Sequence, residues 1–445
     1  MAAHAKQPGP AGEKLRLGER ARPAFMAAAI VAAVGLALSL VLGYGKDGGL
    51  RRFYFAYLFG YAFFLSIALG ALFFVLMQHL TRAGWSVTVR RIGEAIAATI
   101  PVLGILSVPL LAAIAAQKGT PYPWALPLST ATPEAVRAAE RGEASEAPDT
   151  NGADAVEHPT LDSVVLQKRA WLNPGFVIGR VVFYFAIWSW MALWYRKQSV
   201  DQDKSVDPAA TSRMQVLSGI CMLVLGLTLT GAAGDLIMSL DPHWFSTIFG
   251  VYYFAGSAVA SFAVLIIAAR LLQRAGYLNR SITVEHYHDL GKYLFGFTFF
   301  WGYIALSQYM LLWYANIPEE ITWFERRGAT TVASRVTGWS WVIVAILFGQ
   351  LLVPFAGLMS RHVKRRPGVL LAWAVWALAF HLLDVYWLVM PQCPKFTVAS
   401  IAVDLAAVVG IGGAVVATFL HYLGAASLRP IADPRLQESL AFQNV

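Results

Sequence analysis

The chain has few charged residues and almost no cysteine. Only 14% of its residues are charged, whereas 57% are hydrophobic and the mean hydropathy is +0.55. This composition is far from that of soluble proteins. The two cysteines, Cys221 and Cys393, are too few for a four-thiolate iron–sulfur cluster. They also fall near opposite ends of the apolar stretches, so we expect no disulfide between them.

Sequence signals for bound cofactors are missing as well. No Cys-x-x-Cys-His motif is present for covalent haem c, and the polar loops contain no P-loop and no dinucleotide fingerprint. His79, His381 and His421 are poorly placed to form the axial pairs that haem b needs. We therefore expect a chain with no redox centre, no metal ligand and no catalytic residue of its own. Quinone or quinol could still bind to it.

Long apolar stretches dominate the sequence. A helix of about 20 residues crosses a hydrocarbon core of about 30 Å. The sequence therefore predicts an all-α integral membrane protein with ten transmembrane helices. The predicted spans are 24–43, 53–79, 93–116, 174–195, 214–239, 246–271, 290–315, 336–360, 367–390 and 399–423.

The positions of the Lys and Arg residues behind the net charge of +9 indicate how the chain is oriented in the membrane. Lys and Arg concentrate in the segments that are cytoplasmic if the N-terminus is inside, which follows the positive-inside rule. We expect both termini in the cytoplasm, no nucleic-acid partner, and lipid around the spans. The chain then divides into an N-terminal tail 1–23, spans 1–3 in 24–116, a periplasmic loop 117–172, spans 4–10 in 173–424 and a C-terminal tail 425–445.

The periplasmic loop 117–172 is the one long insertion. Its middle, 127–159, is rich in Pro, Ala, Glu and Asp, which predicts poor order. Its ends, Tyr122–Trp124 and Trp171–Pro174, are expected to dock at the membrane interface.

Two segments suggest an internal duplication. The second span ends in Leu80–Gly84 and the sixth in Leu272–Gly276, and these segments share an Arg-Ala-Gly ending. Both spans would run inward, which is consistent with a parallel repeat of spans 2–5 and 6–9. Chance similarity between apolar helices is the alternative.

Ionisable and polar residues lie inside several predicted spans. A charge in a lipid-facing helix is unfavourable by about 2.5–3.5 kcal/mol, so such residues usually face the interior of a bundle and are functional. His381 and Asp384 are three residues apart and share one helix face. The acidic pair Glu319 and Glu320 closes the outer end of span 7. The remaining candidates in the outer part are Arg180, Asp235 and Asp404, with Gln308, Tyr303, Ser307 and Gln350 extending the set.

Two interpretations of this set remain open. It could form an outward-opening quinone site or a proton path, because quinol oxidation releases protons that Asp or His can accept. It could instead consist of ion pairs that fix helix packing, such as Arg180 with Asp235. Four residues nearer the cytoplasm could begin a proton path, although their places near helix ends also suit head-group contact: His79, Glu94, Lys292 and His421.

The longer motifs resemble a known family. Phe297–Tyr309 continues through Trp313–Glu320, and Met238–Thr247 lies upstream. Together with Phe63–Phe74 and His79–Trp85, these segments resemble the NrfD-like membrane subunits of polysulfide-reductase type. They are most similar to the second NrfD-like subunit of bacterial alternative complex III. The resemblance covers roughly residues 50–425.

The resemblance implies an architecture and an assembly. Eight of the ten helices would form two four-helix bundles, spans 2–5 and 6–9, flanked by the other two. The chain would be a non-redox subunit of a quinol:cytochrome c (or quinol:terminal oxidase) oxidoreductase in the respiratory chain of the bacterial inner membrane. Its partners would be an iron–sulfur subunit, c-type haem subunits and a second NrfD-like subunit. Its role would be proton translocation, a quinone pocket, or both.

Two other functions fit the residues alone. The chain could be a purely structural anchor for periplasmic iron–sulfur and haem subunits, or an independent secondary transporter. The transporter is disfavoured because no pair of short, Gly/Pro-broken spans is evident at matching positions of the two halves.

Overall fold

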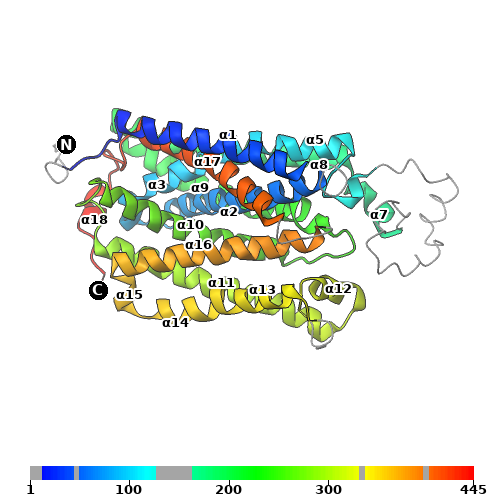
Figure 1. Ribbon diagram of the computed structural model, residues 1–445. Coiled ribbons are helices and arrows are strands. Elements are labelled where there is room, and N and C mark those ends of the chain that lie inside the picture. The colour runs from blue at the N-terminus through cyan, green and yellow to red at the C-terminus, as the bar shows by residue number, and fades with distance from the viewer. Residues whose placement is uncertain (1–12, 45–49, 127–162, 330–335, 394–399, 445) are drawn as a thin grey trace.

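The computed structural model describes residues 13–44, 50–126, 163–329, 336–393 and 400–444. These residues form helices that run side by side along a common direction (Figure 1). The expected all-α fold is confirmed for this part of the chain. Residues 13–17 and 426–444 lie at one end of the bundle, which we call the terminal face; the other end is the opposite face.

Within these ranges, nine helical segments are long and apolar enough to cross a membrane. A multi-pass membrane protein is thereby supported. The predicted span 290–315 lies in α11 (Val284–Ala315), which is long enough but more polar than the nine, because Tyr, Trp, Ser and Gln interrupt it.

The nine apolar segments are α1 (Ala21–Gly43, with η1 Gly18–Arg20), α2 (Arg51–Leu80), the run α3–α5 (Val87–Ala97, Ile100–Leu106, Val108–Ala116, preceded by η2 Gly84–Ser86), α8 (Pro174–Ser205), α9 (Pro208–Leu236, with η5 Met238–Leu240), α10 (Phe249–Arg274), the run α13–η7–α14 (Gly338–Ile346, Leu347–Leu352, Val353–Met359), α16 (Pro367–Val389, with η8 Met390–Gln392) and α17 (Ile401–Ala425).

Short helices lie between these segments or, in the case of α18, after the last of them. They lie at the two faces rather than within the bundle (Figure 1). They are η3 (Pro123–Ala125), α7 (Ser163–Gln167), η4 (Lys168–Ala170), α12 (Pro318–Arg326), α15 (Arg361–Lys364) and α18 (Leu436–Leu440).

Helices α2 and α10 form the centre of the molecule. Within their apolar windows 89% of α2 and 78% of α10 is buried, against 17% of α1. The two helices pack against each other. Helix α2 also contacts α3, α9 and α17, and α10 contacts α9, α11 and α16. Any side chain on the shared side of α2 and α10 is therefore far from lipid.

Helices α1 and α17 pack together through glycine. A Cβ on Gly35 would lie 2.6 Å from the Cα of Gly410, and one on Gly413 would lie 2.6 Å from the backbone N of Ala32. Only glycine permits this close approach of two backbones, as small residues commonly do in membrane helices. The pair lies along one side of the bundle (Figure 1).

Two spans are broken at prolines. The third predicted span divides at Thr99 and Ser107, next to Pro101 and Pro109, because proline lacks an N–H and clashes with the preceding turn. The eighth contains the π-helical segment η7, which ends two residues before Pro354. Such π-helical turns frequently occur at functional sites.

The described ends of the long loop pack against the opposite face. The hydroxyl of Tyr122 donates to the Leu236 carbonyl at 2.9 Å, and the indole N–H of Trp124 donates to the Ser239 carbonyl at 3.1 Å. Asn173 caps α8 by accepting a hydrogen bond from the Phe176 N–H. The expected poor order of 127–159 concerns residues outside the described ranges.

The C-terminal residues 426–444 form a strap across the terminal face. Asp203, at the end of α8, accepts hydrogen bonds from the backbone N–H groups of Ile431 and Ala432. Arg429 bonds to Ser281, and the Leu428 N–H donates to the Leu15 carbonyl. The strap thus links residues 13–17 to the bundle and is itself held against it, whereas the sequence predicted only a tail.

Candidate functional site

The central group lies where α2, α10, α11 and α16 meet. His381 and Asp384 lie three residues apart on α16 and each is 1% exposed. Their shared face points to the interior because the opposite positions of α16 carry large apolar side chains such as Val375 and Trp376. The predicted pair on one helix face is therefore present and buried.

His381 is held by two neighbouring helices. Its Nε2 lies 2.8 Å from the Oγ of Ser66, on α2. On the other side its ring lies against Gly256 of α10, where a Cβ would come within 2.8 Å of the ring carbon Cε1. The imidazole therefore fits into a slot that needs glycine at position 256.

Asp384 has a neutral donor as its hydrogen-bond partner. The Tyr252 hydroxyl, from α10, donates to Oδ1 of Asp384 at 2.5 Å. The second oxygen, Oδ2, lies 4.0 Å from the Nδ1 of His381, and Trp301 of α11 lies beside the carboxyl. We call Ser66, Tyr252, His381 and Asp384 the central group.

The central group differs from the other buried carboxyls in its lack of a permanent cation. Within the described ranges, ion pairs join Arg180 to Asp235 and Arg52 to Asp404, while the one pair at Asp384 is with His381. An unpaired buried carboxylate is unfavourable by several kcal/mol, and the neutral acid avoids this. Exchange of a proton is therefore the chemistry that this arrangement supports.

Asp235 instead belongs to an ion pair near the opposite face. The Nε and Nη2 atoms of Arg180 bond both carboxylate oxygens at 2.8 and 2.7 Å, and the Tyr184 hydroxyl adds a third bond at 3.1 Å. The guanidinium lies 4.1 Å from the ring centre of Trp171. The ion pair that the sequence suggested for Arg180 and Asp235 is thus present.

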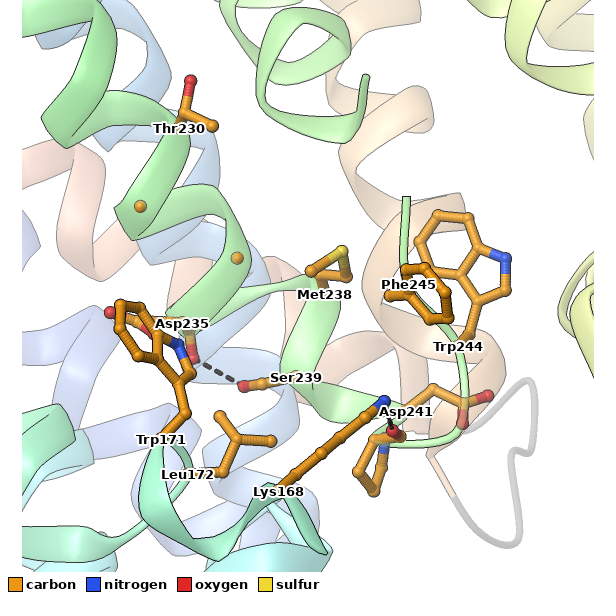
Figure 2. Close-up of a pocket in the computed structure, with 13 residues that line it drawn as sticks. Lys168, Trp171, Leu172, Thr230, Asp235, Met238, Ser239, Asp241, Trp244 and Phe245 are labelled. Atoms are coloured by element: carbon orange, nitrogen blue, oxygen red, sulfur yellow. Dashed lines mark hydrogen bonds between the residues drawn. The ribbon is translucent and has the colours of Figure 1, made fainter. Parts of the chain in front are cut away.

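A pocket of about 370 Å³ adjoins this ion pair (Figure 2). Trp171 and Phe245 contribute aromatic walls, and Met238 lies between them. The Lys168 side chain extends across the pocket, and its ammonium donates to the Pro242 carbonyl at 2.5 Å. The pocket thus combines apolar walls with one cationic donor.

Asp404 also forms a buried pair. Nη2 of Arg52 lies 2.7 Å from its carboxylate and 2.8 Å from the Ser400 carbonyl, and the Tyr386 hydroxyl donates to the same carboxylate at 3.1 Å. This pair joins α2 to α16 and α17. A buried ion pair that ties three helices together in this way suits a structural role.

The other candidates of the outer set differ in their burial. Gln308 and Gln350 are buried, and amide atoms of both have no hydrogen-bond partner among the described residues. Ser307 and Glu320 are partly exposed, and Tyr303 is 60% exposed, so Tyr303 does not face the central group. The side chain of Glu319 lies outside what the structure describes.

The four candidates near the terminal face also differ. Glu94 is 2% exposed and lies 3.3 Å from the Nε of Arg91, and His79 is 1% exposed beside the ring of Tyr195. Lys292 pairs with Asp289, and His421 is exposed on α17. His79 and Glu94 are therefore buried, whereas Lys292 and His421 lie at the surface.

The strap covers the surroundings of Glu94. Arg90, which lies 3.7 Å from Glu94, pairs with Asp433 of the strap. Arg91 donates to the Ser427 carbonyl at 3.3 Å and pairs with Asp203 at 3.1 Å. A chain of charges thus links the strap to the buried end of α3.

Sequence reasoning missed several of these partners. Ser66 and Tyr252 gave no sequence signal beyond a hydroxyl within an apolar span. Arg52 did give one, because Arg51 and Arg52 begin a span at the expected outer side, against the positive-inside rule. Arg327 was also missed: it is buried over the Trp323 ring at 3.6 Å, and burial lowers the pKa of Arg327 to about 9.

Comparisons add no family to this description. A scan against protein-family models and a search of curated proteins each find no match for this chain. In the described part of the chain, no group of three or more His, Cys, Asp or Glu side chains is placed to hold a metal ion. The resemblance to NrfD-like subunits stays a prediction from the motifs.

Proposed function

We propose that this chain is a non-redox membrane subunit of a quinol oxidoreductase of alternative complex III type, and that the central group passes protons. The observation that carries the proposal is the pair His381 and Asp384, buried between α2, α10 and α16 beside neutral donors. The partners would be iron–sulfur, c-type haem and second NrfD-like subunits. The terminal face would be cytoplasmic in a bacterial inner membrane.

The pattern of helix contacts supports the proposed family. In the first half, α2 contacts both α3 and α9, and α8 contacts both α9 and the α4–α5 segment. In the second half, α10 contacts both α11 and α16, and the α13–α14 run contacts both α11 and α16. The same order of neighbours in spans 2–5 and 6–9 is what two related four-helix bundles, with α1 and α17 outside them, would produce.

Buried polar side chains on three central helices support a path from the terminal face. Gln78 of α2, Ser261 of α10 and Thr298 of α11 each have side-chain atoms without a hydrogen-bond partner among the described residues. Buried polar groups of this kind are normally satisfied by water. Gln78 lies 12 residues from Ser66, or about 18 Å along the helix.

His79 and Glu94 would form the inner end of this path. His79 follows Gln78 on α2, and Arg90 lies near both His79 and Glu94. From the central group, Tyr252 is three residues from the start of α10 at the opposite face. Polar residues of the proposed path therefore occur on both sides of the central group, toward each end of the bundle.

A quinone pocket is a second candidate function, favoured by the pocket beside Asp235. A quinone ring is flat and apolar and carries two hydrogen-bond acceptors, which suits aromatic walls with few polar groups. Trp171 and Phe245 supply such walls and Lys168 supplies a donor. Lys168→Met should then weaken quinol turnover and leave the number of protons moved per electron unchanged.

The other two functions predict different behaviour. A structural anchor predicts that neutralising Asp384 changes stability and subunit content only. A transporter predicts activity of the chain alone in liposomes. The two broken spans are the third and the eighth, which are not at matching positions of the proposed repeat, so the structure adds no support for a transporter.

The first test is extraction of the native protein in mild detergent. Subunit mass spectrometry should detect an iron–sulfur protein and a second NrfD-like chain, and a reduced-minus-oxidised spectrum should show c-type haem. A chain that is isolated alone and colourless contradicts the proposed assembly. In the intact complex, Asp384→Asn should lower quinol turnover or proton coupling at unchanged subunit content, whereas Asp207→Asn, at an exposed helix cap, should change neither.

A further inference from the structure

Ser66 forms two close contacts with only one hydroxyl hydrogen. Its Oγ lies 2.7 Å from the Phe63 carbonyl oxygen, one helical turn earlier, and 2.8 Å from the Nε2 of His381. A carbonyl oxygen can only accept. A helical serine commonly donates to a carbonyl of the preceding turn. The hydroxyl hydrogen is then used on Phe63, and the Ser66 oxygen is left as an acceptor.

This arrangement selects one tautomer of His381. For the contact with Ser66 to be a hydrogen bond, Nε2 must carry the hydrogen and donate it. A neutral imidazole has one N–H, so Nδ1 then carries a lone pair. Nδ1 has no hydrogen-bond partner among the described residues, and it lies 4.0 Å from Oδ2 of Asp384.

Tyr252 orients Asp384 in the complementary way. Its hydroxyl donates to Oδ1, so Oδ1 is an accepting oxygen, and Oδ2, which faces His381, is the oxygen that can carry the proton of the neutral acid. The carboxyl hydrogen then lies on Oδ2 of Asp384 and the imidazole lone pair on Nδ1 of His381. These two atoms face each other at 4.0 Å. An approach of about 1 Å would bring them to hydrogen-bond distance.

We propose that Ser66 is a positioning residue that holds His381 in the Nε2–H tautomer, so that Nδ1 is the acceptor for the proton of Asp384. In the transfer, the Oδ2–H bond of Asp384 breaks and an Nδ1–H bond forms. The products are a carboxylate that accepts from Tyr252 and an imidazolium that donates to Ser66. The role in proton passage rests on the proposed function, but the tautomer is a property of the chain alone.

Nitrogen NMR of the full chain, labelled with ¹⁵N-histidine in lipid nanodiscs, tests the tautomer directly. The His381 signals, assigned by their loss in His381→Gln, should show a protonated Nε2 and an unprotonated Nδ1. Ser66→Thr should preserve this pattern, because a threonine hydroxyl can donate to the same carbonyl. Ser66→Ala should lose it, giving a signal from the Nδ1–H tautomer.

Ser257→Ala is the matched control. Ser257 is also a buried helical serine whose hydroxyl donates to an earlier carbonyl, that of Tyr253, at 2.7 Å. Its removal should leave the His381 signals unchanged. A protonated Nδ1 in the unaltered protein overturns the inference without reference to any variant, as does an unchanged spectrum in Ser66→Ala. Neither result bears on whether the native complex moves protons.

Discussion

At the scale of single residues, the central group depends on its small neighbours. His381 can lie between α2 and α10 only because position 256 has no side chain and position 66 has a short one. Close-packed interiors transmit such changes, since a displaced ring cannot keep its hydrogen bonds. A substitution that changes the packing around His381 is therefore expected to change its hydrogen bonds as well.

Gly256→Ala should displace His381. The added Cβ would lie 2.8 Å from Cε1 and 3.0 Å from Nδ1, and overpacking of this kind usually destabilises by about 1–3 kcal/mol. The midpoint of unfolding in detergent measures the change. Gly179→Ala on α8 is the control, because no atom lies within 4 Å of its added Cβ. Equal stability of the two variants would show that the slot around His381 is not tight.

Removing one partner of the buried pair Arg52 and Asp404 should lower stability more than replacing both partners. Removal of one partner leaves a buried charge and should destabilise by about 3–5 kcal/mol, whereas replacement of both by apolar residues should be less harmful than either single change. Unfolding of Arg52→Met, Asp404→Leu and the double variant measures this. The exposed pair Arg213 and Asp207 should contribute less than about 1 kcal/mol in the same cycle. Additive effects at Arg52 and Asp404 would contradict the account.

Residue type and spacing predicted half of the central group. His381 and Asp384 could be found because ionisable residues three apart in an apolar span are rare and share a face. Ser66 and Tyr252 could not, since their roles come from contacts with residues 315 and 132 positions away. The same limit applies to Arg52, whose partner Asp404 is 352 positions away.

At the scale of elements, the strap and α11 meet at a histidine. His286 accepts a hydrogen bond from the Thr283 N–H through Nδ1, and its Nε2 lies 3.3 Å from the Oγ of Ser439 in α18. Burial lowers the pKa of His286 to about 4, although Asp289 and Glu285 act in the opposite direction. A proton on Nδ1 would remove the bond to Thr283.

Docking of α18 should therefore weaken in acid. The undocked histidine has a pKa near 6.5, so between about pH 6.5 and 4 the undocked state binds more protons and docking loses stability as the pH falls. Above pH 6.5 docking should be constant. Hydrogen-exchange protection factors for residues 436–442 measure this. His286→Gln should remove the acid dependence, and persistence of that dependence in the variant would assign it to another group.

Helix existence was easier to predict than helix detail. Long apolar runs predicted the spans, and prolines at positions 101, 109 and 354 explain where two of them break. The π-helical turn at Gln350 and the docking of the strap left no periodic pattern to detect. The strap is held by single polar contacts such as Asp433 with Arg90, which depend on tertiary structure.

At the scale of the whole molecule, the strap closes the terminal face. Thr88 lies beneath Ser439 and is fully buried. In a background with Cys221 and Cys393 replaced by alanine, Thr88→Cys should resist a polar maleimide in the full chain. It should react at least tenfold faster once residues 426–444 are deleted.

Ser205→Cys, at an exposed site on the same face, provides the control and should react in both forms. Circular dichroism should show that the shortened chain keeps its helices. A second variant, Asp433→Asn, loosens the strap without deleting it and should also speed labelling. Rapid labelling of Thr88→Cys in the full chain would mean that the strap does not seal this face.

The most direct test of the central claim is the number of protons moved per electron by the native complex in proteoliposomes. We expect Asp384→Asn to lower this ratio while haem content and subunit composition stay as in the unaltered complex. A ratio and a quinol turnover that are both unchanged in Asp384→Asn would contradict the assignment of proton passage to the central group.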